Sequence, residues 1–159
     1  MPKDSTNETP DRFGRRARVP AGRLLALDLG EKRVGVAVSD ELPLTARPLP
    51  YLRRTNWKQL LGAVADLLQD FDARALVIGL PLNLDGSEGE AAGNVRRLAR
   101  NFSLSLHVPV FLQDERLTSR EAEESLRAEG HSDESLRERI DSEAAAIILR
   151  DYLARFGAE

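Results

Sequence analysis

Two apolar runs joined by a short polar segment constrain the fold of this chain more than any other feature. Leu24 to Leu29 is nearly continuous in apolar residues, which is typical of a strand buried on both faces of a sheet. Residues 34–40 have the pattern of a second strand, and Glu31-Lys32-Arg33 separates the two runs between Gly30 and Gly35. Because glycine adopts turn dihedrals that other residues resist, we predict a hairpin with this tripeptide as its turn.

Asp28 is the exception within the first run. Aspartate is disfavoured in strands, and an unpaired carboxylate inside a sheet is costly. A charge at such a position usually serves a site, so Asp28 is the first candidate functional residue. The alternative is structural: Asp28 could end its strand or accept backbone hydrogen bonds in the turn at Gly30.

The remainder of the chain alternates strand and helix patterns, which predicts an α/β fold with a mixed sheet. Asn56 and Gln59 are spaced as an N-cap pair for the clearest amphipathic helix. The predicted elements are, in order, an edge strand within 42–52 that holds three prolines, a helix over 57–71, a strand over 75–80, a helix over 90–102, a strand over 108–113, a helix over 118–127 and a last helix over 137–155.

Length and composition favour one globular domain. A chain of 159 residues is long enough for a single core, which we place at residues 23–156 after an aperiodic, flexible arm over residues 1–22. There are no cysteines, which excludes disulfides and thiolate metal sites and is compatible with a cytoplasmic location. No apolar stretch is long enough to predict a membrane span or a membrane partner.

The charge distribution argues against a broad phosphate-binding surface. The net charge is −3, but residues 1–23 carry six basic against three acidic residues, which leaves 17 against 23 in the body. An acidic body allows only local basic patches for contact with nucleic acid.

Three acidic residues from distant segments are expected to meet at one edge of the sheet. Asp28 and Glu115 lie near the ends of predicted strands, and Asp141 shares a helical stripe with Ala144, Ala145, Ile148 and Tyr152. Oxygen-only ligands suit Mg²⁺ or Mn²⁺, and such a centre can hydrolyse phosphodiester bonds. Structural alternatives remain, because Glu115 could pair with a nearby arginine and Asp141 could favour the first turn of its helix. Neither His107 nor His131 has ligand-type spacing.

Four ordered motifs carry a resemblance to a known family. They are Ala26 to Gly30 continued by Arg33 to Asp40, Gly79 to Asn83 with Asp85-Gly86, Asp114 to Thr118, and Asp141 with Ala144-Ala145. This pattern resembles the YqgF/RuvX family, which is similar to the RuvC Holliday junction resolvases. The resemblance implies a ribonuclease H-like fold with a five-stranded mixed sheet whose second strand is antiparallel to the rest. It also implies that Asp28, Glu115 and Asp141 are catalytic, metal-binding acids.

The family resemblance implies two substrates for the same centre. One is the precursor of 16S ribosomal RNA, processed at its 5′ end, which we favour; the other is branched DNA such as a Holliday junction. RNA trimming can proceed with a monomer, whereas symmetric cutting of a junction calls for a homodimer. A non-catalytic binding module and an actin-like ATPase, whose phosphate motif Asp28-Leu29-Gly30 also resembles, are further alternatives. The ATPase would need a second domain, for which we expect no room.

Local cations and polar donors near the acids are the candidate contacts to nucleic acid. These are Lys32 and Arg33 in the predicted turn, Asn83 after the strand that ends near residue 80, and Arg116 beside Glu115. Solvated turn residues would show the same pattern.

Overall fold

The protein is described by a computed structural model that covers residues 8–10, 16–18, 22–40, 45–115 and 133–156, with side chains described over 22–40, 45–115 and 142–155. The described residues form strands and helices that follow one another along the chain. They are β1 (Glu8–Pro10), β2 (Arg16–Arg18), β3 (Leu24–Leu29), β4 (Arg33–Ser39), β5 (Ala46–Arg53), α1 (Trp57–Asp70), β6 (Ala75–Pro81), α2 (Glu90–Ser105), β7 (Val110–Glu115) and α4 (Asp133–Phe156).

The main sheet is mixed and has five strands in the order β5-β4-β3-β6-β7. β4 is antiparallel to both β3 and β5, whereas β3, β6 and β7 are mutually parallel. The predicted topology, in which only the second of five strands is antiparallel, is therefore confirmed.

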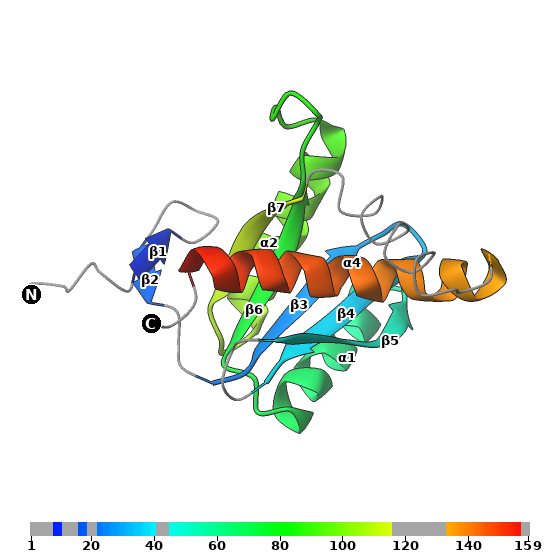
Figure 1. Ribbon diagram of the computed structural model, residues 1–159. Coiled ribbons are helices and arrows are strands. Elements are labelled where there is room, and N and C mark those ends of the chain that lie inside the picture. The colour runs from blue at the N-terminus through cyan, green and yellow to red at the C-terminus, as the bar shows by residue number, and fades with distance from the viewer. Residues whose placement is uncertain (1–7, 11–15, 19–21, 41–44, 116–132, 157–159) are drawn as a thin grey trace, which may run out of the picture.

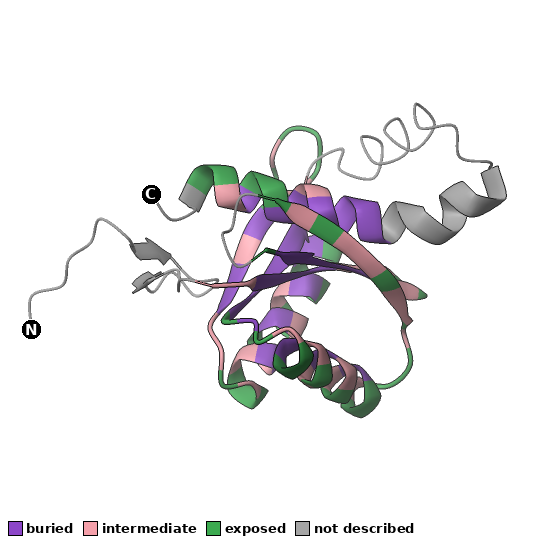
Figure 2. Cartoon of the chain, turned by 60° about the horizontal axis from the view of Figure 1, so that its bottom comes forward, coloured by how far each residue is buried: buried purple, intermediate pink, exposed green. Residues whose placement is uncertain are grey.

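Helices cover both faces of this sheet, as Figures 1 and 2 show. One apolar core forms between the sheet and helices α1 and α2, and it contains the odd-numbered positions of β3, Leu25 and Leu27. The second core forms against α4 and contains the even-numbered positions, Leu24 and Ala26. Because side chains alternate along a strand, this division identifies the face on which each strand residue lies.

Helix α1 follows the predicted amphipathic pattern. Asn56 Oδ1 accepts a hydrogen bond from the backbone N–H of Gln59 at 2.9 Å, which confirms the expected N-cap. The buried side chains of the helix are Leu60, Val64 and Leu68, spaced as one helical face. Trp57 packs edge to face on Phe102 of α2, with ring centroids 4.7 Å apart, so the two helices share one core.

The predicted hairpin forms, but its turn is shorter than expected. Arg33 begins β4, so its expected place in the turn is wrong, whereas Gly35 lies within the strand as predicted and is opposite Asp28. The reason for glycine at position 30 also differs. Its φ is not among the positive values of the described glycines, yet a Cβ there would lie 2.6 Å from the carbonyl oxygen of Arg33. Close backbone approach, rather than a special dihedral, excludes a side chain at Gly30.

Other boundaries move by a few residues. β7 begins two residues later than predicted and continues to Glu115, while α4 begins at Asp133 rather than near 137. The helix predicted over 118–127 lies outside the described residues.

The first 22 residues contain two short strands that the sequence pattern did not indicate. β1 and β2 pair antiparallel, with Thr9 opposite Ala17. Flexibility of the remainder of this arm, and the domain limit at residue 23, stay predictions.

Over the described part of the chain, no helix has the length and apolar character required to cross a bilayer.

Candidate active site

The acidic residues of β3 and β7 lie on the face of the sheet that α4 covers. Leu24 and Ala26 of β3 belong to the α4 core, so by alternation Asp28 lies on the same face. Phe111 belongs to that core as well, which places Glu115, four residues further along β7, on the same face. Both carboxylates occur at the carboxyl ends of parallel strands, where ligands bind in open α/β sheets.

Gly79 on β6, the strand between β3 and β7, brings these two acids close together. The β3–β6 register pairs Leu27 with Ile78, so the next residues, Asp28 and Gly79, are level with each other. Glu115 is opposite Pro81, but its side chain turns back over Gly79: a Cβ on Gly79 would be only 2.7 Å from Glu115 Oε2. The absence of a side chain at position 79 thus provides the space that the Glu115 carboxylate uses.

Helix α4 is anchored beside the partner of Asp28. Ser142 Oγ accepts a hydrogen bond from the backbone N–H of Val36 at 3.3 Å. Val36 follows Gly35, the residue paired with Asp28, and the β4–β5 register shifts between Val34 and Val36. The helix therefore crosses the sheet at the position of the first acid.

The predicted stripe of α4 is confirmed where its side chains are described. Ala144, Ala145, Ile148 and Tyr152 are all fully buried. Asp141 lies in α4, one residue before Ser142, and its side chain lies outside the described residues. The structure thus brings Asp28 and Glu115 together and carries the backbone of Asp141 to the same part of the sheet.

The donor set has the chemistry of a divalent-cation site. Carboxylate oxygens are hard ligands that suit Mg²⁺ or Mn²⁺, and no softer donor occurs among the three candidate acids. Over the residues with described side chains, which do not include Asp141, no group of three His, Cys, Asp or Glu residues is placed to hold an ion. Completion of such a site depends on the third acid.

Gln113 is a residue of this face that the sequence interpretation missed. It is buried, with 7% of its surface exposed, and lies opposite Gly79 and two residues before Glu115. Its amide oxygen makes no hydrogen bond within the described part of the protein. The usable signal was alternation: Phe111, Gln113 and Glu115 share one face, so a polar residue stands between the core and the acid. A buried free acceptor at this point could receive a hydrogen bond from a bound water.

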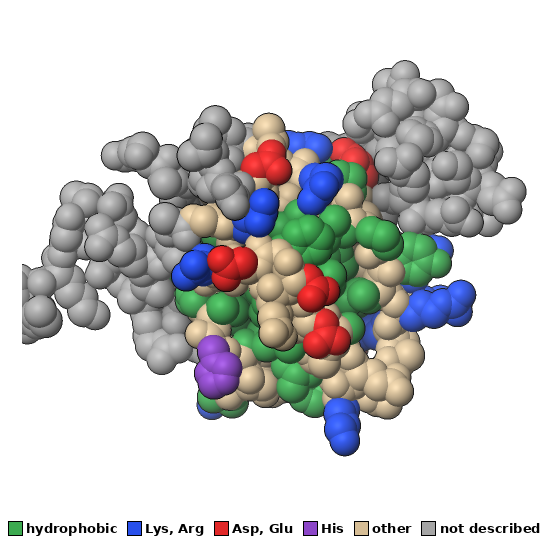
Figure 3. Space-filling model, turned by 90° about the horizontal axis from the view of Figure 1, so that it is seen from below, with side chains coloured by type: hydrophobic (Ala, Val, Ile, Leu, Met, Phe, Trp, Pro, Cys, Tyr) green, Lys and Arg blue, Asp and Glu red, His purple; other side chains and the backbone are tan. Residues whose placement is uncertain are grey.

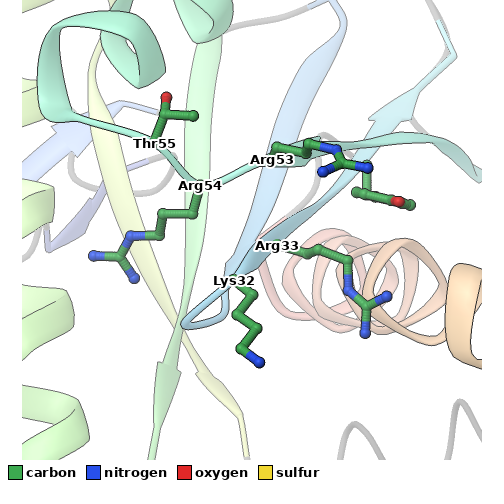
Figure 4. Close-up of a pocket in the computed structure, with 6 residues that line it drawn as sticks. Lys32, Arg33, Arg53, Arg54 and Thr55 are labelled. Atoms are coloured by element: carbon green, nitrogen blue, oxygen red, sulfur yellow. The ribbon is translucent and has the colours of Figure 1, made fainter.

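Two of the predicted nucleic-acid contacts line an open pocket of about 540 Å³ beside the hairpin. Lys32 is exposed and Arg33 is half-buried. Figure 4 shows the cluster of cations around this hairpin. The sequence interpretation missed the other lining residues, which are Tyr51, Arg53, Arg54 and Thr55 at the end of β5. The signal was the basic pair Arg53-Arg54, which follows Tyr51 after one residue at the end of an edge strand.

Asn83 has a structural role in the loop after β6. Its Nδ2 atom donates to Ser87 Oγ at 2.9 Å, and its backbone N–H donates to the Ser87 carbonyl at 2.9 Å. The loop starts beside the acid, because the N–H of Leu82 donates to the Glu115 carbonyl at 3.4 Å. Arg116 lies outside the described residues.

Away from the pocket beside the hairpin, the face seen in Figure 3 and the start of α2 carry charges of both signs. On the surface seen in Figure 3, basic and acidic side chains are dispersed around apolar and neutral ones. On α2, Arg96 donates to Glu88 at 2.6 and 2.8 Å. On this one face, the charges agree with the expectation of local rather than broad basic patches.

A family model described as "RuvX: Holliday junction resolvase" matches residues 22–155 of this chain. Among curated proteins, one from Anaeromyxobacter sp. (strain Fw109-5), named "Putative pre-16S rRNA nuclease", is 45% identical over 82% of this chain and 96% of its own length. A protein of the same name from Syntrophus aciditrophicus (strain SB) is 44% identical over 86% of this chain and 91% of its own.

Solved structures support the fold. T. thermophilus RuvC in complex with a Holliday junction substrate superposes with a TM-score of 0.51 at 18% identity, covering 86% of this chain and 96% of that chain. Fowlpox virus resolvase with Holliday junction DNA gives a TM-score of 0.52 at 11% identity, over 84% and 97% of the two chains. The predicted ribonuclease H-like α/β fold is thus confirmed.

Proposed function

This chain belongs to the RuvX family, and from that membership and the site we propose that it is a metal-dependent nuclease that processes the 5′ end of the 16S ribosomal RNA precursor. The observation that carries the proposal is the arrangement around Gly79, where the Glu115 carboxylate packs over a residue level with Asp28. The names of the curated relatives support the ribosomal RNA substrate.

We assign Asp28, Glu115 and Asp141 as the catalytic acids. Their carboxylates would hold Mg²⁺ or Mn²⁺, which when bound supplies an activated water and stabilises the leaving oxygen. The protein's own contribution is to fix the ligands. The Glu115 carboxylate and the end of Ile148 share the space over Gly79, since a Cβ there would be only 2.7 Å from Glu115 Oε2 and 2.5 Å from Ile148 Cδ1. A ligand held in a packed site needs less reorganisation when the substrate binds.

Lys32 and Arg33 are proposed to bind phosphate groups of the substrate next to these acids. Arg116 is proposed to do the same from beside Glu115. For Asn83 we propose a role in shaping the loop that borders the site, since its side chain is bonded to Ser87.

Resolution of branched DNA is the second candidate, and the description of the family model favours it. The two functions differ in assembly. A junction has to be cut at two symmetric positions, which requires a two-fold dimer, whereas one protomer suffices to trim an RNA end.

The deciding experiment compares cleavage of a precursor RNA containing the 16S 5′ leader with cleavage of a four-way DNA junction, each with Mg²⁺ or Mn²⁺. Parent protein, Asp28→Asn and Glu115→Gln are assayed side by side. Asp66→Asn, on the exposed side of α1, is the matched control because it removes the same charge away from the site. We expect cutting of the RNA, loss of cutting in both site variants by at least about a hundredfold, and parent activity in the control.

Other outcomes point elsewhere. Paired symmetric nicks in the junction, with no cutting of the RNA, would make the protein a resolvase. If the parent cuts neither substrate with either metal, a non-catalytic binding module becomes the better explanation. Activity retained by Asp28→Asn would remove the proposed mechanism.

A further inference from the structure

Two arginines face each other directly across the outer pair of strands. The β4–β5 register places Arg33 opposite Arg53. This register brings two positive charges to the same point of the sheet. In Figure 4 both side chains extend to the same side of the strands, whereas Arg54 extends to the opposite side. Two guanidinium groups on one side of the strands can both donate hydrogen bonds to one phosphate group.

An aromatic ring lies within the same cluster. The guanidinium carbon of Arg33 is 5.5 Å from the centroid of the Tyr51 ring. Tyr51 is half-buried, so part of its surface remains available to a ligand. Arginine together with an accessible aromatic ring is the combination on which unpaired bases stack in proteins that bind single-stranded nucleic acid.

The backbone under this cluster is fixed by hydrogen bonds. Arg54 Nη1 donates to the Gly30 carbonyl at 2.8 Å, and the backbone N–H of Arg54 donates to the Lys32 carbonyl at 2.8 Å. The end of β5 is thereby tied to the hairpin turn. The described residues lining the pocket include four cations and no acid, in a protein whose body is acidic. A local concentration of this kind attracts a polyanion.

The cluster borders the proposed catalytic acids. Ala37 belongs to the α4 core, so by alternation Gly35 and Arg33 lie on the same face as Asp28. Gly35 pairs with Asp28, and Arg33 is two residues further along β4, which corresponds to about 7 Å. A strand whose scissile phosphate lay at Asp28 would therefore present a neighbouring nucleotide to the arginine pair.

We propose that the pocket formed by Lys32, Arg33, Tyr51, Arg53 and Arg54 binds a single-stranded segment of nucleic acid next to the bond that is cut. A backbone phosphate lies between Arg33 and Arg53, and an unpaired base stacks on Tyr51. The inference rests on the proposed nuclease function and adds to it a requirement that the substrate be unpaired on this side of the cleavage position. A base held in a duplex cannot stack on Tyr51, because its faces are covered by its neighbours.

The test is equilibrium binding by fluorescence anisotropy, with the full chain in EDTA so that no metal-dependent cleavage takes place. The probes are a fluorescein-labelled single-stranded RNA of about 12 nucleotides and the same strand annealed to its complement. Tyr51→Leu should weaken binding of the single strand about tenfold, while Tyr51→Phe, which keeps the ring, should bind as the parent does. Arg53→Gln should lower the slope of log K against log salt by about 0.7, the change expected for one lost phosphate contact on a single strand.

Arg47→Gln is the matched control. Arg47 is an exposed arginine of the same strand, but it lies over the ring of Phe71, with 5.9 Å to the centroid, and outside the pocket. Its removal should leave affinity and salt slope unchanged. The fluorescence of the single tryptophan, Trp57, during denaturant unfolding verifies that each variant is folded.

Two results would overturn the proposal. The first is a Tyr51→Leu protein that binds the single strand with the affinity of the parent. The second is a Tyr51→Leu protein that loses the same affinity for single-stranded and for duplex RNA, which would indicate a phosphate contact without base stacking. Failure of the nuclease function is distinguishable, because these measurements contain no metal. Variants that bind normally, in a protein that cleaves through Asp28, would reject the pocket alone. Pocket-dependent binding by a protein that never cleaves would leave the pocket in place and reject the nuclease.

Discussion

The hydroxyl of Ser142 accepts a hydrogen bond from the backbone N–H of Val36 at 3.3 Å, although 106 positions separate the two residues. Both groups are buried, so the contact fixes the early part of α4 against β4. This hydrogen bond lies next to two of the proposed catalytic acids. Val36 is adjacent to the partner of Asp28, and Ser142 is adjacent to Asp141, so one hydrogen bond sets the spacing between two proposed catalytic segments.

Ser142→Ala should lower both stability and cleavage. Loss of the acceptor leaves a buried N–H unsatisfied, which costs about 1–3 kcal/mol of the free energy of unfolding. Because Ser142 acts as a positioning residue, RNA affinity in EDTA should stay at the parent value while the turnover rate with metal falls. Denaturant unfolding, anisotropy and single-turnover cleavage measure the three quantities.

Ser105→Ala, at the exposed end of α2, is the control and should change none of them. A variant that lost stability alone, with cleavage intact, would limit Ser142 to a structural role.

Gly79→Ala should disturb the site through one methyl group. The added Cβ would lie 2.5 Å from Ile148 Cδ1 and 2.7 Å from Glu115 Oε2, so the helix or the carboxylate has to move. Overpacking of this kind costs about 1–3 kcal/mol, and displacement of Glu115 should reduce cleavage further. Thermal unfolding and cleavage assays check both effects.

Gly62→Ala is the matched substitution for that experiment. Gly62 is exposed on α1, and its Cβ would meet nothing within 4 Å. Alanine there should stabilise the helix by about 0.5–1 kcal/mol and leave cleavage unchanged. A Gly79→Ala protein as stable and active as the parent would show that the space over Gly79 is not required.

Gly30→Ala should distort the hairpin turn. A Cβ would lie 2.6 Å from the carbonyl oxygen of Arg33, and backbone atoms cannot yield as a flexible side chain does. The N–H of Gly30 donates to that oxygen at 3.0 Å, so the turn would open at this hydrogen bond. We expect a lower midpoint of thermal unfolding and weaker RNA binding in EDTA, because Lys32 and Arg33 follow directly. Gly93→Ala on α2, where a Cβ meets nothing within 4 Å, should show neither change.

The ion pair between Glu88 and Arg96 should titrate in acid. Hydrogen bonds from the Arg96 guanidinium lower the pKa of the Glu88 carboxyl below its ordinary value. A group whose pKa is lower in the folded state contributes stability above its unfolded pKa, and that contribution is lost as the pH falls through the lowered value. The contribution should be small, since both side chains are 42% exposed. Arg96→Gln should return the pKa of Glu88 to its ordinary range in a carboxyl NMR titration, whereas an unchanged pKa would exclude this cause.

The spacing of apolar residues along the sequence was sufficient to predict most of the strands and helices. The apolar run at Leu24 predicted a strand covered on both faces, and the spacing of Leu60, Val64 and Leu68 predicted α1, because burial repeats with the period of the element itself. The hairpin turn was predicted less well. Gly30 is required by a backbone contact with Arg33, and no periodicity reports such a contact.

The site was predictable only as a set of residue types. The sequence supplied Asp28 as an acid in a buried strand, Glu115 after a later strand and Asp141 on an apolar helical stripe, and the motifs around them indicated the family. The sequence could not predict that Gln113 lies opposite Gly79 or that Arg33 lies opposite Arg53, because both pairings follow from register between strands rather than from position along one.

The sequence by itself determined most of the elements and the chemical nature of the candidate ligands, since these depend on residues local to each segment, and its motifs indicated the family and with it the expected topology. Only the tertiary structure decided how the segments meet. The β3–β6 register sets Gly79 level with Asp28, the space over Gly79 holds the Glu115 carboxylate and the end of Ile148, and the contact between Ser142 and Val36 fixes the position of α4. These relations join residues far apart in the chain, and their energy is gained only when the sheet and its covering helices are packed together.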